Sequence, residues 1–257
     1  MKAYLINLDR SPGRLAESDA ELKRAGIAYE RIRAVDGRTL SGEEIRRSSD
    51  RLAFLFANGR RLKVNELACA LSHQSCYRAG LAAGDPYFAV FEDDVVVDGA
   101  AFAAAEARIA GENDPARPML WLINRRNVVP DPGRACSVRL LETRNDIMHT
   151  WGGEGYVVNR AAAERLLAIA FPVRYVLDAW PTYARQGVDV RVVFPTACTV
   201  RDTPSDIART AKGRASWKWY QRFGWFKYRV GFRLDILWWR LVRSRRFRST
   251  RGREGTV

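Results

Sequence analysis

Three consecutive acids, Glu92, Asp93 and Asp94, directly follow the apolar run at residues 87–91. Burying neighbouring carboxylates without partners is costly, because they repel one another and lose their hydration. Side chains alternate along a strand, so Glu92 and Asp94 are expected to point to the same side. A Mn²⁺ or Mg²⁺ ion held by Asp94 and Glu92 would neutralise both and bridge them to a diphosphate, since these ions prefer oxygen ligands. The alternative is a solvated acidic turn after a strand.

Alternating strands and helices are expected around this triplet. Apolar residues 3–8 predict a buried strand, and Ser11 followed by Pro12 is typical of a helix start, with Gly26 after the helix end. The remaining pattern predicts strands at 29–35, 87–91, 119–123, 155–158 and 188–194, and helices at 65–83, 100–110 and 160–170. Residues 39–63 are expected to form an irregular connection with one helix.

This order predicts an α/β fold, in which the polar residues that follow strands are the first candidates for a site. Ligands bind such folds at the carboxyl ends of the strands. Asn7, Asp9, Arg10 and Arg14 follow the first predicted strand. Arginine suits phosphate recognition because its guanidinium can bond two oxygens. The alternative for Arg10 and Arg14 is a solvated first helical turn.

Basic residues gather at the C-terminal end of the chain. The net charge is +14, yet 15 of the 43 basic residues and only 2 of the 29 acidic residues lie from Arg209 onward. Residues 1–208 are therefore nearly neutral. We expect residues 1–208 to form one catalytic domain and residues 209–257 to form a separate basic tail.

Aromatic residues accompany the charge in this tail, which holds five of the eight tryptophans. Apolar residues recur there at helical spacing, at Trp225, Tyr228, Phe232, Ile236, Trp239 and Val242. The spacing predicts an amphipathic helix, and the arginines beside it suit an anionic membrane surface. A helix packed on the catalytic domain is the alternative. Nucleic-acid binding is not expected, because residues 1–208 contain no recognisable nucleic-acid module.

The cysteines and the N-terminus bear on the cellular compartment. None of Cys69, Cys76, Cys136 and Cys198 is paired at Cys-x-x-Cys spacing, which argues against a zinc knuckle. Cys69 and Cys76 are expected on one helix face as small buried apolar residues. The opening apolar run is too short for a signal peptide, and no run of about 18 uncharged apolar residues follows. We therefore expect a cytoplasmic protein with reduced thiols.

Three motifs, in this order, resemble those of glycosyltransferase family 25, the lipopolysaccharide and lipooligosaccharide galactosyltransferase group related to the collagen galactosyltransferases. They are residues 4–14 (Tyr-Leu-Ile-Asn-Leu-Asp-Arg-Ser-Pro-Gly-Arg) with Ala-Val-Asp-Gly at 34–37, residues 66–73 (Glu-Leu-Ala-Cys-Ala-Leu-Ser-His) and residues 91–95 (Phe-Glu-Asp-Asp-Val). A weaker fourth similarity covers residues 155–163 and 178–180. The resemblance extends over roughly residues 1–200.

The resemblance implies a GT-A-like fold, a Rossmann-type mixed sheet flanked by helices that binds a nucleotide sugar, usually UDP-galactose. It implies transfer with inversion onto a lipid-linked glycan such as lipopolysaccharide core, with Mn²⁺ or Mg²⁺ at the acidic triplet. The protein is then expected at the inner membrane of a bacterium, bound peripherally through its tail. The alternative is a non-catalytic nucleotide-sugar or membrane-surface binding protein that retains the fold.

The donor site implied by the resemblance draws on all three motifs: Asn7, Asp9, Arg10, Arg14, Asp36, His73, Glu92 and Asp93. His73 is expected to orient the acidic triplet or the diphosphate, although a lone histidine on a helix is more often structural. The second histidine, His149, is a weaker candidate for a metal ligand.

An inverting transferase needs a base that takes the proton of the acceptor hydroxyl. Asp178, at an expected helix start, and Glu154, within a glycine-rich stretch that allows close approach, are the two candidates. Asp178 is the preferred one.

Overall fold

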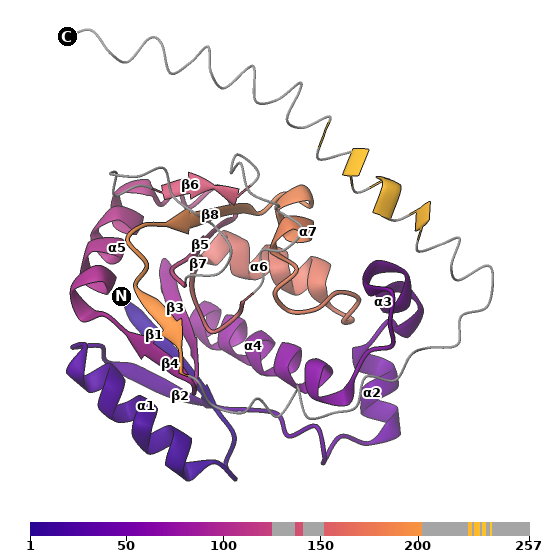
Figure 1. The fold of residues 1–257 in the computed structure, drawn as a ribbon, viewed down its shortest axis with the longest axis horizontal. Helices are drawn as coiled ribbons and strands as arrows, with labels where there is room; N and C mark the ends of the chain where they lie inside the picture. Colours follow the sequence, from indigo (N-terminus) through magenta and orange to yellow (C-terminus); the bar gives the residue numbers. More distant parts are fainter. Residues whose placement is uncertain are drawn as a thin grey trace, which may run out of the picture.

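The computed structural model shows a sheet flanked by helices (Figure 1). It describes residues 1–124, 137–140 and 152–201 and, in the C-terminal region, the helical residues 226–227, 229–231, 233–234 and 237. No helix among these residues combines the length and the apolar character that a membrane span needs.

The main sheet of the described chain has seven strands, and it is mixed. In spatial order they are β2 (Tyr29–Arg33), β1 (Lys2–Asn7), β3 (Tyr87–Glu92), β7 (Gly155–Asn159), β5 (Met119–Leu122), β8 (Asp189–Val193) and β6 (Ser137–Arg139). Only β7 and β6 run against the others. A second sheet pairs β4 (Val95–Val97) with β9 (Cys198–Val200).

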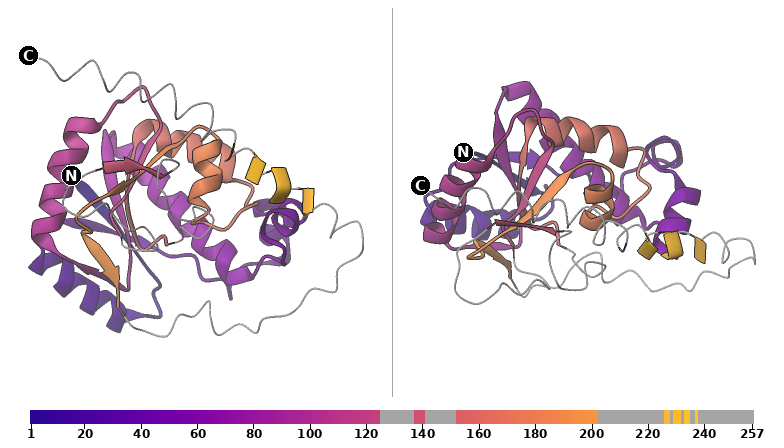
Figure 2. Two further views of the ribbon diagram at one scale, coloured as in Figure 1. Left: turned by 45° about the horizontal axis from the view of Figure 1, so that its top comes forward. Right: turned by 90° about the horizontal axis from the view of Figure 1, so that it is seen from above.

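Helices cover both faces of the main sheet (Figure 2). One face packs on α4 (Val64–Ala83), α6 (Arg160–Ala170) and α7 (Trp180–Arg185), and the other on α1 (Pro12–Arg24) and α5 (Gly99–Glu112). Strand alternation divides the core accordingly: Tyr4 and Ile6 join the first face, and Ala3 and Leu5 the second. Burial on both faces explains why the inner strands β1, β3, β7 and β5 are continuous apolar runs.

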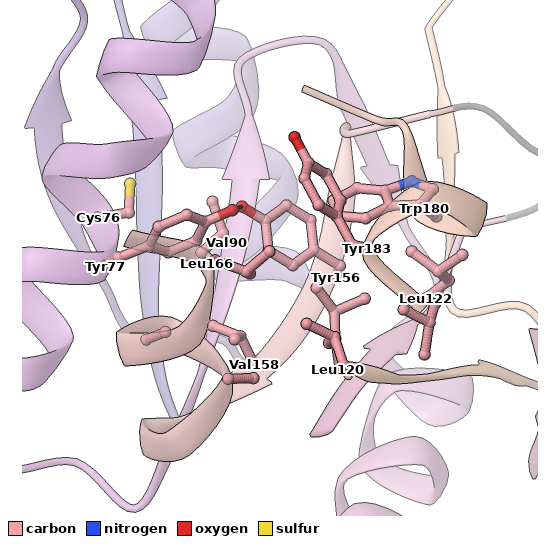
Figure 3. Close-up of a cluster of buried hydrophobic side chains, with 14 of the residues drawn as sticks. Cys76, Tyr77, Val90, Leu120, Leu122, Tyr156, Val158, Leu166, Trp180 and Tyr183 are labelled. Carbon is pink, nitrogen blue, oxygen red and sulfur yellow. Dashed lines mark hydrogen bonds between the residues drawn. The ribbon is translucent and has the colours of Figure 1, made fainter. Parts of the chain in front are cut away.

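Close packing on the α4 face depends on aromatic rings and one glycine. Figure 3 shows the rings of Tyr77, Tyr156 and Trp180 in this part of the core. The ring of Phe88 lies against α4 at Gly80, where an added Cβ would come within 2.2 Å of it. Gly80 therefore sets how closely α4 approaches β3, the strand that leads into the acidic triplet.

The predicted α/β fold with a mixed sheet flanked by helices is confirmed. The prediction of a single helix within residues 39–63 is wrong, because this stretch forms both α2 (Gly42–Ser48) and α3 (Arg51–Asn58). Ser41 and Glu44 cap α2 reciprocally, and the Asp50 side chain accepts a hydrogen bond from the first turn of α3. Both caps are legible in the sequence, but helices of seven and eight residues are too short to show a clear periodicity.

The C-terminal region is helical at the residues that the structure describes. Four apolar side chains there are between 38% and 60% exposed: Phe226, Val230, Leu234 and Leu237. Their spacing places them on one face of a helix. The face predicted from Trp225 to Val242 lies outside the described residues.

Five strands end at the same edge of the main sheet, and β7 begins there. Asn7 ends β1 and Glu92 ends β3, while the segment before Gly155 leads into β7 from the same edge. Most of the site residues predicted from the sequence therefore lie at this edge.

Candidate functional site

A pocket of about 740 Å³, including its open mouth, lies at this edge between β1, α1, α4 and the end of β3. Seven of the predicted site residues line it: Asn7, Arg10, Arg14, His73, Glu92, Asp93 and Asp94. The structure therefore brings these seven side chains together in one cavity.

Asp93 is held from two sides at the back of the pocket. Asn7, fully buried, donates from Nδ2 to Asp93 Oδ2 at 2.7 Å, and Arg14 lies 2.6 Å from Asp93 Oδ1. Ser18 of α1 donates to the Asp93 carbonyl at 2.8 Å. Arg14 also reaches Asp94 Oδ2 at 3.2 Å, so one guanidinium serves two carboxylates.

The triplet is not one continuous piece of strand. β3 ends at Glu92, a turn holds Asp93 and Asp94, and β4 begins at Val95. The alternation expected for Glu92 and Asp94 therefore does not extend through the triplet. Instead Glu92 faces His73 on α4, whereas Asp93 and Asp94 face Arg14 on α1. All three still line the same pocket.

The electrostatics of this cluster favour a bound cation. Burial, and next the neighbouring Glu92, raise the pKa of Asp94 to about 6, against the opposing effect of Arg14. Burial also raises the pKa of Asp93. Asp94 Oδ1 is buried and accepts no hydrogen bond from the described residues. Three carboxylates beside one shared guanidinium thus leave an excess of negative charge and an oxygen that fits a divalent ion.

His73 is fully buried, and both ring nitrogens have partners. Nδ1 lies 2.7 Å from the Tyr156 hydroxyl, and Nε2 lies 3.3 Å from Glu92 Oε1. Tyr156 in turn shares a 2.8 Å hydrogen bond with Tyr77. This chain of contacts ties α4 to β7 and the end of β3. Tyr156 lies in the stretch of weaker family similarity at residues 155–163, and no local pattern predicts a role for its hydroxyl.

Cys69 differs from the expectation that both helix cysteines are buried. Cys76 is buried in the core, but Cys69 is half-buried and lines the pocket one turn before His73. Burial and the nearby carboxylates, Glu92 first among them, hold the pKa of the Cys69 thiol well above its ordinary range. The ligand atoms of Cys69, His73 and Glu92 lie within 4.8 Å of one another.

Asp9 and Asp36 lie outside the pocket wall. Asp9 forms ion pairs with Arg31 and Arg33 on β2. Asp36 lies 3.1 Å from Arg10 and 2.7 Å from Arg38, and these two arginines hold its pKa well below the ordinary value. Asp36 thus positions Arg10, which does line the pocket, rather than facing the cavity itself.

The segment before β7 is clamped at Gly152, whose φ of 122° favours glycine. Asp178 accepts a 2.8 Å hydrogen bond from the Gly152 amide. Trp180 and Asn124 donate to the Gly152 carbonyl at 2.8 and 3.2 Å. An added Cβ at Gly152 would lie 2.6 Å from Glu154 Oε2. No local pattern predicts the role of Asn124, because that role depends on a contact across the fold.

The two candidate bases differ in exposure. Glu154 is only 4% exposed, whereas Asp178 is half-buried. A Cβ added at Gly153, directly before Glu154, would lie 3.2 Å from Glu92 Oε1, so this segment adjoins the triplet. Asp178 is therefore the more exposed of the two candidates. His149 lies outside the described residues.

Comparison with known families shows one match. Residues 1–180 match the family described as "Glycosyltransferase family 25 (LPS biosynthesis protein)". This span includes β1 to β3, the whole pocket wall, Glu154 and Asp178.

Individual relatives are more distant. The chain is 26% identical over 215 residues to the "Lacto-N-neotetraose biosynthesis glycosyltransferase LgtE" of Neisseria meningitidis serogroup B, covering 77% of this chain and 74% of the relative. It is 34% identical over 97 residues to the "Probable inactive glycosyltransferase 25 family member 3" of Rattus norvegicus, covering 37% of this chain and 17% of that protein.

A solved structure shows a limited similarity to this chain. The galactosyltransferase LgtC in complex with donor and acceptor sugar analogs aligns over 79% of this chain and 88% of its own, with a TM-score of 0.37 and 10% identity. Similarity at this level does not define a shared fold.

Proposed function

Because this chain belongs to glycosyltransferase family 25, we propose that it transfers a sugar, galactose from UDP-galactose, onto a lipid-linked oligosaccharide with inversion at the anomeric carbon. The observation that carries the proposal is the pocket at the sheet edge, where three carboxylates, two arginines and Asn7 converge. Such a set suits a diphosphate and its counter-ion. The inversion and the choice of donor follow from the family resemblance.

The donor diphosphate is proposed to lie between Arg10, Arg14 and the acidic triplet. Both arginines line the pocket, and guanidinium groups bind phosphate oxygens in pairs. Asp94 and Glu92 would hold Mn²⁺ or Mg²⁺, with Asp93 kept in place by Asn7. Such an ion supplies positive charge that stabilises the departing diphosphate. Arg14, bridging Asp93 and Asp94, keeps that carboxylate pair oriented toward the donor.

Asp178 is proposed as the base that accepts the acceptor hydroxyl proton. Its carboxylate is half-buried, and one oxygen, Oδ2, accepts a hydrogen bond from the Gly152 amide. That bond fixes the carboxylate beside the segment that adjoins Glu92. Glu154 is the weaker candidate because its near-complete burial keeps an acceptor away.

The second candidate function is a non-catalytic protein that keeps the fold. The alternative is supported by one relative, whose own name reads "Probable inactive". The three carboxylates, His73 and Asp178 are all present here, which favours turnover. Metal-dependent release of UDP from a UDP-sugar separates the two, because a binding protein consumes no donor.

Association with an anionic membrane surface is proposed for residues 209–257. Exposed Phe226, Val230, Leu234 and Leu237 form an apolar stripe, and basic residues such as Arg233 accompany it. A peripheral helix of this kind would hold the enzyme beside a lipid-linked acceptor at the inner membrane.

The donor is best identified by thermal shift with a set of nucleotide sugars, each with and without Mn²⁺. A ligand present at 100 times its Kd stabilises the fold by about 2.7 kcal/mol, a readily measured shift. We expect UDP-galactose with Mn²⁺ to give the largest shift. Equal melting temperatures with every nucleotide sugar would contradict the proposal.

A further inference from the structure

We propose that Cys69, His73 and Glu92 form a zinc-selective site in the wall of the pocket, and that zinc bound there inhibits the enzyme. Their Sγ, imidazole nitrogen and carboxylate oxygen lie within 4.8 Å of one another. Two ligand atoms on one tetrahedral zinc ion are separated by roughly 3.5 Å, given zinc–ligand bonds of about 2.0–2.3 Å. Rotamer adjustments of about an ångström therefore bring the three atoms into range.

The helix supplies two of these ligands in register. Cys69 and His73 are four residues apart on α4, so their side chains lie on the same face, one turn apart. Glu92 reaches them from the end of β3, whose distance to α4 is set by the Gly80–Phe88 contact. The site is thus built on a helix and a strand of the core.

A second layer of contacts already orients the histidine. The Tyr156 hydroxyl holds His73 Nδ1 at 2.7 Å, which leaves Nε2 directed at Glu92. Metal-bound histidines characteristically have their other nitrogen held in this way. Tyr77 fixes the Tyr156 hydroxyl in turn, as Figure 3 shows for the two rings.

The ligand types decide which ion binds. Thiolate and imidazole favour Zn²⁺, whereas Mn²⁺ and Mg²⁺ prefer oxygen ligands such as those of Asp94. Three protein ligands leave a fourth position, and Cys69, His73 and Glu92 all line the pocket from which a further ligand would enter. The site therefore resembles zinc sites that keep one position open rather than closed structural ones.

Zinc would inhibit sugar transfer because the zinc site and the proposed Mn²⁺ or Mg²⁺ site share Glu92. Zinc on the Cys69 side draws on the same carboxylate that Mn²⁺ or Mg²⁺ would use with Asp94. This step rests on the proposed function, whereas zinc binding itself does not. Zinc is therefore expected to raise the Mn²⁺ concentration that the transferase needs.

Cobalt titration of the full-length, chelator-treated protein tests the site without any donor present. We expect one Co²⁺ per chain, with a thiolate-to-cobalt charge-transfer band in the near ultraviolet that Zn²⁺ abolishes by displacement. Cys69→Ser should lose the band and weaken zinc binding by about 100-fold or more, while Tyr156→Phe should weaken it by about 10–100-fold. The matched control is Cys76→Ser, on the same helix but buried in the core, which should keep the band.

The outcomes separate this inference from the proposed function. A wild-type protein without a thiolate band, or a Cys69→Ser variant that keeps it, would overturn the zinc site whether or not sugar transfer occurs. Zinc inhibition of transfer is then measured relative to each variant's own uninhibited rate. Inhibition that is equal in Cys69→Ser and Cys76→Ser would overturn the inhibitory role. Thermal melting of both variants confirms that each is folded during the titration.

Discussion

Replacing Asp94 with asparagine should stabilise the metal-free protein while removing its function. Asp94 is ionised at neutral pH in a buried position beside Glu92, and its side chain is 17% exposed. Asparagine has nearly the same shape without the charge. The substitution therefore removes an unfavourable ionised group from the folded protein, together with a proposed metal ligand.

The size of the effect follows from the pKa. Its rise from 3.8 to about 6 means that ionised Asp94 lowers the free energy of unfolding by about 3 kcal/mol, since one pKa unit corresponds to about 1.4 kcal/mol. The loss of the Arg14 contact is already contained in this net value. The cost is absent below about pH 3, where Asp94 is protonated in both states, and it grows as pH rises through 3.8 until it is complete above about pH 7.

The assay is thermal melting of chelator-treated wild type and Asp94→Asn between pH 4 and pH 8. We expect the variant to melt about 5–10 °C higher at pH 8, with most of this difference lost by pH 4. Asp19→Asn is the control, because Lys23 and Tyr29 lower the pKa of this half-buried carboxyl and its loss should bring no stabilisation. A variant that melts lower than wild type at pH 8 would refute the electrostatic reasoning.

Three other perturbations test separate parts of the account. Asp178→Asn should lower the rate of transfer by about 10²–10⁴-fold while UDP binding stays intact, because the base that takes the acceptor proton is lost. Glu154→Gln should lower the rate of transfer less. Near-normal turnover by Asp178→Asn would rule out Asp178 as the base. Gly152→Ala should destabilise the fold by about 1–3 kcal/mol, because the φ of Gly152 is 122° and the new Cβ would contact Glu154. Gly111→Ala is the control and should not destabilise the fold, because the space around Gly111 is open. Removal of residues 209–257 should abolish cosedimentation with anionic vesicles, and equal partitioning of both forms would count against the tail as an anchor.

Much of the candidate site was predictable because it follows a rule of the fold class. Asn7 and the acidic triplet each end an apolar run, and parallel strands bring such ends to one edge. Arg14 follows from the same rule, since the first helix starts beside that edge. Local sequence was sufficient to predict the location of a site residue wherever that residue lies at, or just after, the end of a strand.

Other features depend on contacts that local sequence does not encode. Cys69 reads as one of two equivalent helix cysteines, and only the packing of α4 turns it toward the pocket while Cys76 faces the core. The Gly152 clamp joins Asn124, Asp178 and Trp180 across separate elements. Asp9 follows β1 only two residues after Asn7, yet arginines on β2 hold it outside the pocket wall.

The most direct test of the central claim is UDP release from UDP-galactose with a lipooligosaccharide acceptor, measured with and without Mn²⁺ for wild type and Asp94→Asn. The account predicts release by the wild type that needs both Mn²⁺ and acceptor, and none above background by Asp94→Asn although that variant is folded. Undiminished release by Asp94→Asn, or release that is independent of Mn²⁺ in both proteins, would contradict the proposed role of the acidic triplet.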